Sequence, residues 1–279
     1  MAERPYLGID HVVLRTAVAE PLFELLHQQF GLPVTWPLQH APFATYGWIG
    51  VGNTNLEIWA AADNSDLPAD CPLPLFHQIA LAPVRLEETV ASIQASGLSC
   101  KAPRAFVSRN ENGDAHTNFT NSVVLDLSSD SCCVFVCEWG DMAPIAPWKH
   151  GLSLNQRRAD HQAALEAVSG GRLGFERLSE IELTTPDVPA ATEKWQRLSR
   201  SFCVPIKIAD DVDLSVALGE RDAIQALTFT VHNLDLARRA LVEDGLLEQP
   251  GNLEEVVVSL RATGGVRIRL VEEPRTPAE

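Results

Sequence analysis

Basic residues are scarce in this sequence, and no segment gathers them. The 279 residues include 22 lysines and arginines against 37 aspartates and glutamates, so the formal net charge is −15 at pH 7. The densest basic pair is Arg157 and Arg158, which lie among polar residues. Because a nucleic-acid interface needs a concentrated basic face, we expect no nucleic-acid partner.

Long apolar runs are also absent. Residues 1–5 lead directly into a strand-like run instead of an apolar signal region, and no uninterrupted apolar stretch has the length of a membrane span. We therefore expect a cytoplasmic protein that does not cross a membrane.

The cysteines form no recognisable framework. Six of them in a chain of this length are too few for a disulfide-stapled scaffold, and their spacing fits no structural zinc pattern. We interpret them as small buried hydrophobic residues.

The hydrophobic pattern repeats along the chain. A strand-like alternation is followed by a helical spacing and then by further short strands, a βαβββ order. The first copy is expected at 9–16 (strand), 19–30 (helix), 34–38, 43–51 and 54–60 (strands). The second is expected at 75–82 (strand), 86–96 (helix), 105–108, 122–127 and 132–139 (strands), with the polar insert 109–120 as a long loop.

Two shorter copies follow a connector. The third has a strand at 178–184, a helix at 188–199 and two strands near 205–209 and 214–218; the fourth has a strand at 225–231, a helix at 234–243 and strands at 255–260 and 266–271. Four copies make two pairs. We therefore expect a first domain at 1–140, a connector with a helix at 141–174, and a second domain at 175–279.

Potential metal ligands stand inside otherwise apolar strands of the first pair. His11 and Glu57 lie on the first and last strands of copy one, and Glu138 lies on the last strand of copy two. On the first strand of copy two, His77 and Gln78 are adjacent. A buried carboxylate or imidazole must be paired, hydrogen-bonded or metal-bound, because an isolated charge in the interior is costly.

Tandem βαβββ copies with ligands on their first and last strands resemble the vicinal oxygen chelate superfamily, which includes glyoxalase I, extradiol dioxygenases, and fosfomycin- and bleomycin-resistance proteins. The resemblance implies an α+β fold in which paired modules form two U-shaped, partly open, barrel-like sheets with helices outside. It also implies a divalent ion, zinc, nickel, manganese or iron(II), held by His11, Glu57, Glu138 and either His77 or Gln78. The hydrophobic phase favours Gln78, since a one-residue slip reverses the facing and both residues can coordinate only through a bulge.

The equivalent positions of the second pair hold Glu180, Ala226 and Arg269, which do not make a ligand set. We expect this pair to hold no metal and to cover the first sheet, form part of a pocket wall or provide a dimer surface. Extradiol dioxygenases carry their metal in the second pair, so this placement argues against that activity.

The resemblance implies a glyoxalase-like lyase or isomerase acting on a small carbonyl or vicinal-oxygen substrate. A Lewis-acid ion would stabilise an enediolate, with Glu138 first and Glu57 second as the candidate base. Arg15, Trp59 and His116 are candidate pocket residues; Arg15 is expected either to bind an anionic substrate group or to neutralise a carboxylate. The other histidines, His161 among them, are expected to have no functional partners.

Two alternatives remain from the sequence. One is a non-catalytic protein that binds and sequesters a small molecule; the other is an extradiol-type dioxygenase. Pairing of copy one with copy four instead of copy two would separate His11 and Glu57 from the other donors, and we expect adjacent pairing because only this arrangement unites all of them.

Overall fold

The computed structural model describes residues 3–109, 112–141, 152–248 and 254–273. Residues 142–151 of the expected connector lie outside these ranges. Within the described ranges, no helix combines the length and the apolar character that a membrane span requires.

The first copy has the expected order of elements. A proline near the start of its helix is compatible with the first turn, and Gly31, at φ 72°, follows the helical segment in the left-handed conformation that glycine favours. The helix changes to a π-helical turn, η1, before it ends. The elements are β1 (Tyr6–Arg15), α1 (Glu20–Glu24), η1 (Leu25–Gln29), β2 (Val34–Ala41), β3 (Ala44–Gly50) and β4 (Asn55–Ala61).

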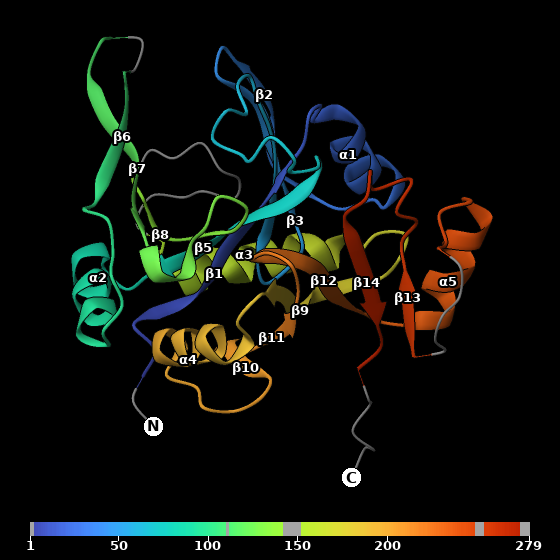
Figure 1. Ribbon diagram of the computed structural model, residues 1–279. Helices are drawn as coiled ribbons and strands as arrows, with labels where there is room; N and C mark the ends of the chain where they lie inside the picture. The colour runs from blue at the N-terminus through green and yellow to red at the C-terminus, as the bar shows by residue number, and fades with distance from the viewer. Residues whose placement is uncertain (1–2, 110–111, 142–151, 249–253, 274–279) are drawn as a thin grey trace.

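The second copy differs from expectation in its polar insert. Residues 115–120 do not form a loop but belong to the second strand of a hairpin that projects from the body of the molecule (Figure 1). The hairpin forms because both strands pair across six register positions. The elements are β5 (Leu75–Pro83), α2 (Leu86–Ala95), β6 (Arg104–Arg109), β7 (Ala115–Val123), the short 3₁₀-helix η2 (Leu125–Leu127) and β8 (Cys133–Trp139).

The remaining copies are shorter, as the sequence predicts, with two strands after each helix. A connecting helix, α3, precedes them and begins with a capping box made by Ser153 and Gln156. The elements are α3 (Leu154–Ala167), β9 (Phe175–Thr185), α4 (Val188–Ser199), β10 (Ile206–Ala209), β11 (Val212–Leu218), β12 (Ala223–Val231), α5 (Leu234–Glu243), β13 (Glu255–Val257) and β14 (Arg267–Val271).

Adjacent copies pair through their first strands. In the first half the strand order is β2-β3-β4-β1-β5-β8-β7-β6, with β1 and β5 antiparallel. In the second half the order is β10-β11-β9-β12-β14-β13, with β9 and β12 antiparallel. A single pair, Ile224 with Phe76, joins the two halves into one mixed sheet. The α+β class and the adjacent pairing are therefore as expected.

The sheet of the first half curves strongly. Trp36 on β2 and Trp139 on β8 are five strands apart in the sheet order, which in a flat sheet corresponds to about 24 Å. Their ring centroids are only 6.2 Å apart. The two arms of the sheet therefore face each other across a concave surface.

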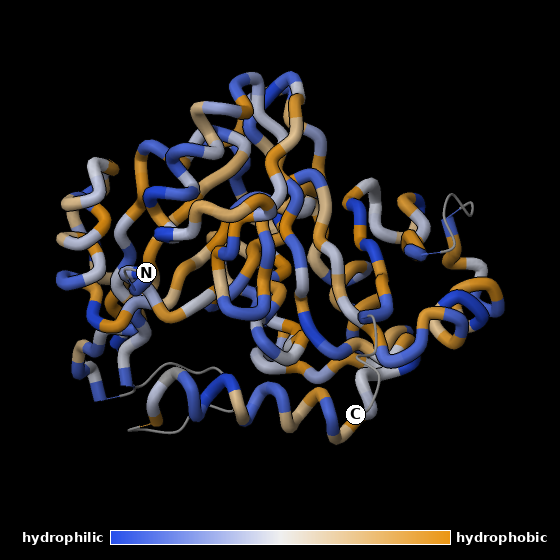
Figure 2. The backbone as a smooth tube through the Cα atoms, turned by 90° about the horizontal axis from the view of Figure 1, so that it is seen from below, coloured by the Kyte–Doolittle hydropathy of each residue, from blue (hydrophilic) through white to orange (hydrophobic). Residues whose placement is uncertain are grey.

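The two faces of β1 have different partners. Val12 and Leu14 belong to the main hydrophobic core on the helix side of the sheet, whereas His11 lies on the concave side beside Phe135 of β8. Ala80, Phe135 and Cys137 form a small separate apolar cluster on that side. Figure 2 shows α3 along one side of the molecule, and this helix contacts β3 of the first half and β9 of the second.

Candidate functional site

His11 and Glu57 meet on the concave surface of the first half. Strands β1 and β4 run parallel, and their register places Glu57 beside Val13, two residues beyond His11 and on the same face. Nε2 of His11 lies 3.4 Å from Oε2 of Glu57, and their side chains are 4% and 12% exposed. Regular alternation along two strands thus brings together the two donors that the sequence predicts for copy one.

Asp10 holds the other ring nitrogen of His11. A bulge in β1 makes this possible, because Ile9 pairs with Leu81 and His11 pairs with Ala80, so Asp10 has no partner of its own in β5. Oδ2 of Asp10 lies 2.7 Å from Nδ1 of His11 and accepts a hydrogen bond of 2.8 Å from the Trp139 indole N–H. The imidazole is therefore fixed between two carboxylates.

Burial raises the pKa of Glu57 above its usual value. The neighbouring His11 and the Trp48 indole lower the pKa, and the charge of Asp10 raises it, but desolvation is the largest effect. Glu57 is thus more basic than an exposed glutamate.

Aromatic rings from both arms of the sheet surround this group. The ring of Trp48 lies 4.5 Å from that of His11, and the ring of Trp139 lies 5.3 Å from Trp48 and 6.2 Å from His11. Four tryptophans of the described ranges belong to this cluster. We call it the aromatic cluster; its members are Trp36, Tyr46, Trp48, Trp59, Phe106, Phe119, Phe135 and Trp139.

Glu138 does not face the concave surface, and this corrects the expectation that it is the fourth donor. Its Oε1 accepts a hydrogen bond of 3.0 Å from the backbone N–H of Leu86, the first residue of α2. The alternation of β8 places Cys137 and Trp139 on the concave side, so Glu138, between them, points to the helix layer. Its carboxylate caps the positive end of α2.

A second bulge places His77 and Gln78 side by side. Val13 pairs with Gln78 and Leu14 pairs with Phe76, so His77 is the additional residue of β5. Nε2 of Gln78 lies 3.2 Å from Nδ1 of His77. Burial lowers the pKa of His77, and the nearby charge of Arg15 lowers it further. Gln78 shares the concave face with Glu57, on the opposite side of Val13.

Arg15 neutralises a carboxylate and is not available to a substrate. Its guanidinium binds both carboxylate oxygens of Asp66 at 2.5 Å and the amide oxygen of Asn64 at 2.9 Å. It also donates to the backbone carbonyl of Asp63 at 3.2 Å. Of the two roles that the sequence leaves open, the structure favours the second, and Arg15 thereby binds the loop at 63–66 to the end of β1.

The other two expected pocket residues, Trp59 and His116, make their contacts with residues other than His11 and Glu57. Trp59 shares the face of Glu57 and stacks on Tyr46, with ring centroids 5.3 Å apart. His116 lies on β7 in the projecting hairpin, where its Nε2 is 2.9 Å from Oγ of Ser108. Trp59 is thus part of the aromatic cluster, whereas His116 is engaged within the hairpin.

Of the expected metal donors, His11 and Glu57 lie beside each other, and Gln78 shares their face of the sheet. In the described ranges of the chain, no three histidine, cysteine, aspartate or glutamate side chains are grouped so that they could hold one ion. His11 and Glu57 by themselves do fit: two ligands bound to one tetrahedral ion at about 2.0–2.1 Å lie roughly 3.3–3.4 Å apart. The Asp10 carboxylate behind His11 is also typical of histidine ligands.

The matching positions of the second half carry different chemistry. Nη1 of Arg269 donates to Oε2 of Glu182 at 2.6 Å, and Ala226 is the strand partner of Glu182. Glu180 pairs with Thr228 on the same two strands. An ion pair therefore lies on β9 and β14, the strands that match β1 and β8 of the first half.

A pocket opens at the Asp10 end of the concave surface. Trp48 and Trp139 form part of its wall, and α3 closes it on the outside with Arg157, Arg158 and His161. The lining residues are Ile9, Asp10, Trp48, Gly52, Asn53, Thr54, Asn55, Trp139, Arg157, Arg158 and His161.

Sequence reasoning missed several of these residues. Strict alternation places Asp10 on the face opposite to His11, and only the bulge reverses it. His161 has no signal in the sequence, because its place in the pocket depends on tertiary structure. The aromatic cluster had a sequence signal, since Trp36, Trp48 and Trp59 recur in consecutive strands of copy one.

No family model and no curated protein matches the sequence. Solved structures do match over almost its full length. Homoprotocatechuate 2,3-dioxygenase from Arthrobacter globiformis is 12% identical with a TM-score of 0.60, covering 98% of this chain and 81% of that one. The same enzyme from Brevibacterium fuscum, in complex with 3,4-dihydroxyphenylacetate, is 12% identical with a TM-score of 0.58, covering 100% of this chain and 84% of that one. These similarities establish the fold.

Proposed function

Since the chain has the fold of the vicinal oxygen chelate superfamily, we propose that the first half binds a small planar organic molecule on its concave surface. The observation that carries the proposal is the aromatic cluster, whose rings come from both arms of the sheet and enclose the buried His11–Glu57 pair. Aromatic walls with a few fixed polar groups are the usual composition of a small-molecule site.

The polar groups of the site suit recognition and proton transfer. Asp10 holds Nδ1 of His11, so Nε2 is directed at Glu57 and at whatever lies beside it. Glu57, with its raised pKa, can accept a proton from a bound molecule and return it. The residues of this half therefore provide a base and an oriented imidazole within an apolar enclosure.

Binding can be tested by intrinsic fluorescence, because four tryptophans lie in the cluster. The first probe is 3,4-dihydroxyphenylacetate, followed by other planar aromatic compounds. We expect saturable quenching that weakens at least tenfold in Trp59→Ala. The matched control is Phe202→Ala, which removes a ring that is 77% exposed in the second half. Quenching that is not saturable, or that Phe202→Ala weakens as much as Trp59→Ala, contradicts the proposal.

A second candidate is metal-dependent chemistry of the lyase or isomerase type. The 3.4 Å separation of the His11 and Glu57 donors favours it, and Gln78 lies on the same face. These residues would hold a divalent ion, which supplies Lewis-acid polarisation of a substrate carbonyl. In this arrangement Glu57, and not Glu138, remains as the candidate base.

Metal analysis of protein purified without a histidine tag separates the two candidates. About one divalent ion per chain, lost in His11→Ala and retained in Glu182→Ala, supports the metal-dependent candidate. Protein that binds a planar ligand but holds no stoichiometric ion after dialysis against zinc, manganese or iron(II) supports binding alone.

A further inference from the structure

The connecting helix α3 contributes to the binding site. Arg157 and His161 are four residues apart on this helix and so lie on one face, and both line the pocket beside Asp10. Burial lowers the pKa of both side chains, and the charge of Asp10, which lines the same pocket, opposes this effect. The connector therefore adds polar groups to the end of the aromatic surface.

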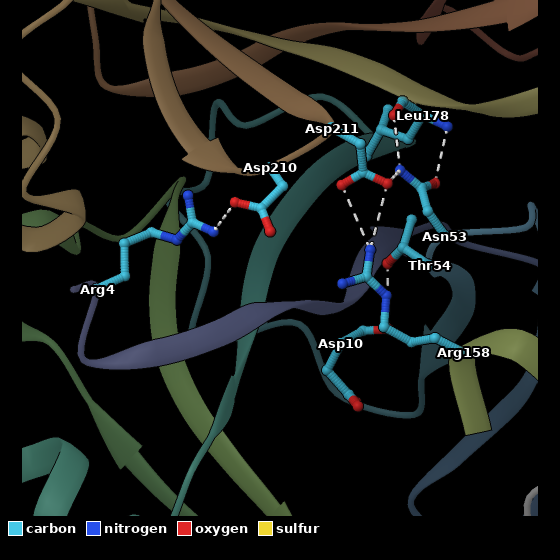
Figure 3. Close-up of polar contacts among 8 residues, drawn as sticks. All are labelled: Arg4, Asp10, Asn53, Thr54, Arg158, Leu178, Asp210 and Asp211. Carbon is cyan, nitrogen blue, oxygen red and sulfur yellow. Dashed lines mark hydrogen bonds and ion pairs between the residues drawn. The ribbon is translucent and has the colours of Figure 1, made fainter. Parts of the chain in front are cut away.

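Contacts with the second half fix the position of this helix (Figure 3). Nη2 of Arg158 lies 3.3 Å from both carboxylate oxygens of Asp211, which also accepts a hydrogen bond of 2.9 Å from Asn53. The Asn53 amide pairs with the backbone of Leu178 in both directions, at 2.8 and 2.9 Å. The pocket is thus a preformed feature of the junction between the halves.

His161 has an unsatisfied polar atom. The residue is 8% exposed, and its buried Nδ1 has no hydrogen-bond partner among the residues that the structure describes. Buried polar groups without a partner are rare because they lose their hydration and gain nothing in return. Burial also lowers the pKa of His161, which favours the neutral imidazole, able to donate or accept, and this residue lines the pocket.

The surrounding charges select the chemistry of the group that would pair with His161. Asp10 only accepts hydrogen bonds and carries a negative charge that disfavours a carboxylate. Arg157, whose Nη1 donates to the carbonyl of Leu152 at 2.6 Å, and Arg158 carry positive charges that disfavour an ammonium group. A neutral group that both donates and accepts hydrogen bonds is compatible with His161 and with the three charged side chains around it.

We infer that His161 and Arg157 form a subsite for a neutral hydrogen-bonding substituent, such as a primary amide, on the planar ligand of the concave surface. The inference rests on the proposed function, and it names the end of the ligand that lies toward α3.

Three ligands of similar size test it: benzamide, benzoate and benzylammonium, each titrated by ligand-observed NMR. We expect benzamide to bind at least tenfold more tightly than the two charged compounds. In His161→Phe, which retains the ring volume, and in His161→Ala, the benzamide affinity falls at least fivefold while the others change little. His40→Phe, at an exposed histidine of β2, preserves the order.

Each outcome is decisive. Equal affinities for the three compounds, or an undiminished preference for benzamide in both His161 variants, overturns the subsite and leaves the aromatic site intact. If none of the compounds, and no other planar aromatic probe, binds to the wild-type chain, the proposed function fails together with the subsite.

Discussion

Asp10 and His11 are neighbours in sequence whose side chains nevertheless meet on the same side of a strand, with Oδ2 of Asp10 2.7 Å from Nδ1 of His11. The bulge in β1 produces this contact. Because Asp10 also accepts from Trp139, one carboxylate joins the imidazole on β1 to the aromatic ring on β8.

Replacing Asp10 by alanine removes the acceptor of both bonds. We expect a loss of about 1–3 kcal/mol in the free energy of unfolding, since two buried donors lose their partner. Asp10→Asn, which keeps an oxygen acceptor, should lose less. Urea denaturation of the two variants checks this; equal stability of Asp10→Ala and wild type contradicts the contact.

Glu57 should make stability depend on pH in the direction opposite to most carboxylates. Its folded pKa is raised, so above about pH 4.5 the folded state binds more protons than the unfolded state, and stability falls as pH rises through this window. Glu57→Gln removes this loss, so its stability relative to wild type should increase from pH 4 to pH 8. Denaturation curves across this range provide the measurement, with Glu24→Gln, at an exposed position of α1, as the control. A difference that shrinks with rising pH contradicts the burial of Glu57.

Glu138 should matter for stability and not for ligand binding. Glu138→Ala removes the acceptor at the start of α2, and we expect a loss of about 0.5–2 kcal/mol, as for other helix caps. Glu138→Gln, which keeps an acceptor oxygen, should be milder. Fluorescence titration should give the wild-type affinity for both variants; lost binding without lost stability would show that this side chain serves the concave surface.

Arg15 should act through Asp66. Its hydrogen bonds lower the pKa of Asp66 from its usual 3.8, so the stabilisation is present above that pH and disappears as the pH falls below it. Arg15→Met should remove this part of the acid dependence and expose the loop at 63–66 to hydrogen exchange. Unchanged acid unfolding together with unchanged hydrogen exchange of this loop contradicts a stabilising role for the Arg15–Asp66 contact.

Regular alternation made half of the site predictable. On β1 the apolar residues Val12 and Leu14 show which face packs against the helices, and on β4 Leu56 and Ile58 do the same. His11 and Glu57 are therefore expected on the other face, where the structure places them. The helix-ending glycines and the four repeats were equally readable, since glycine at positive φ and the change of hydrophobic period are local signals.

The other half depended on features without a local signal. Strand β8 is apolar on both faces, from Val134 to Cys137, so its phase could not be read and Glu138 was assigned to the wrong side. Asp10 and His77 occupy bulges, which arise from pairing between strands. His161 lies at the pocket because tertiary contacts, among them Arg158 with Asp211, hold α3 in place.

The most direct test of the account is a crystal structure of the chain with the tightest-binding planar ligand from the fluorescence titrations. We expect the ligand on the concave surface of the first half, in contact with rings of the aromatic cluster. One of its polar atoms should lie within about 3.5 Å of His11 or Glu57, the length of a hydrogen bond. A ligand bound only in the second half, against Glu182 and Arg269, would contradict it.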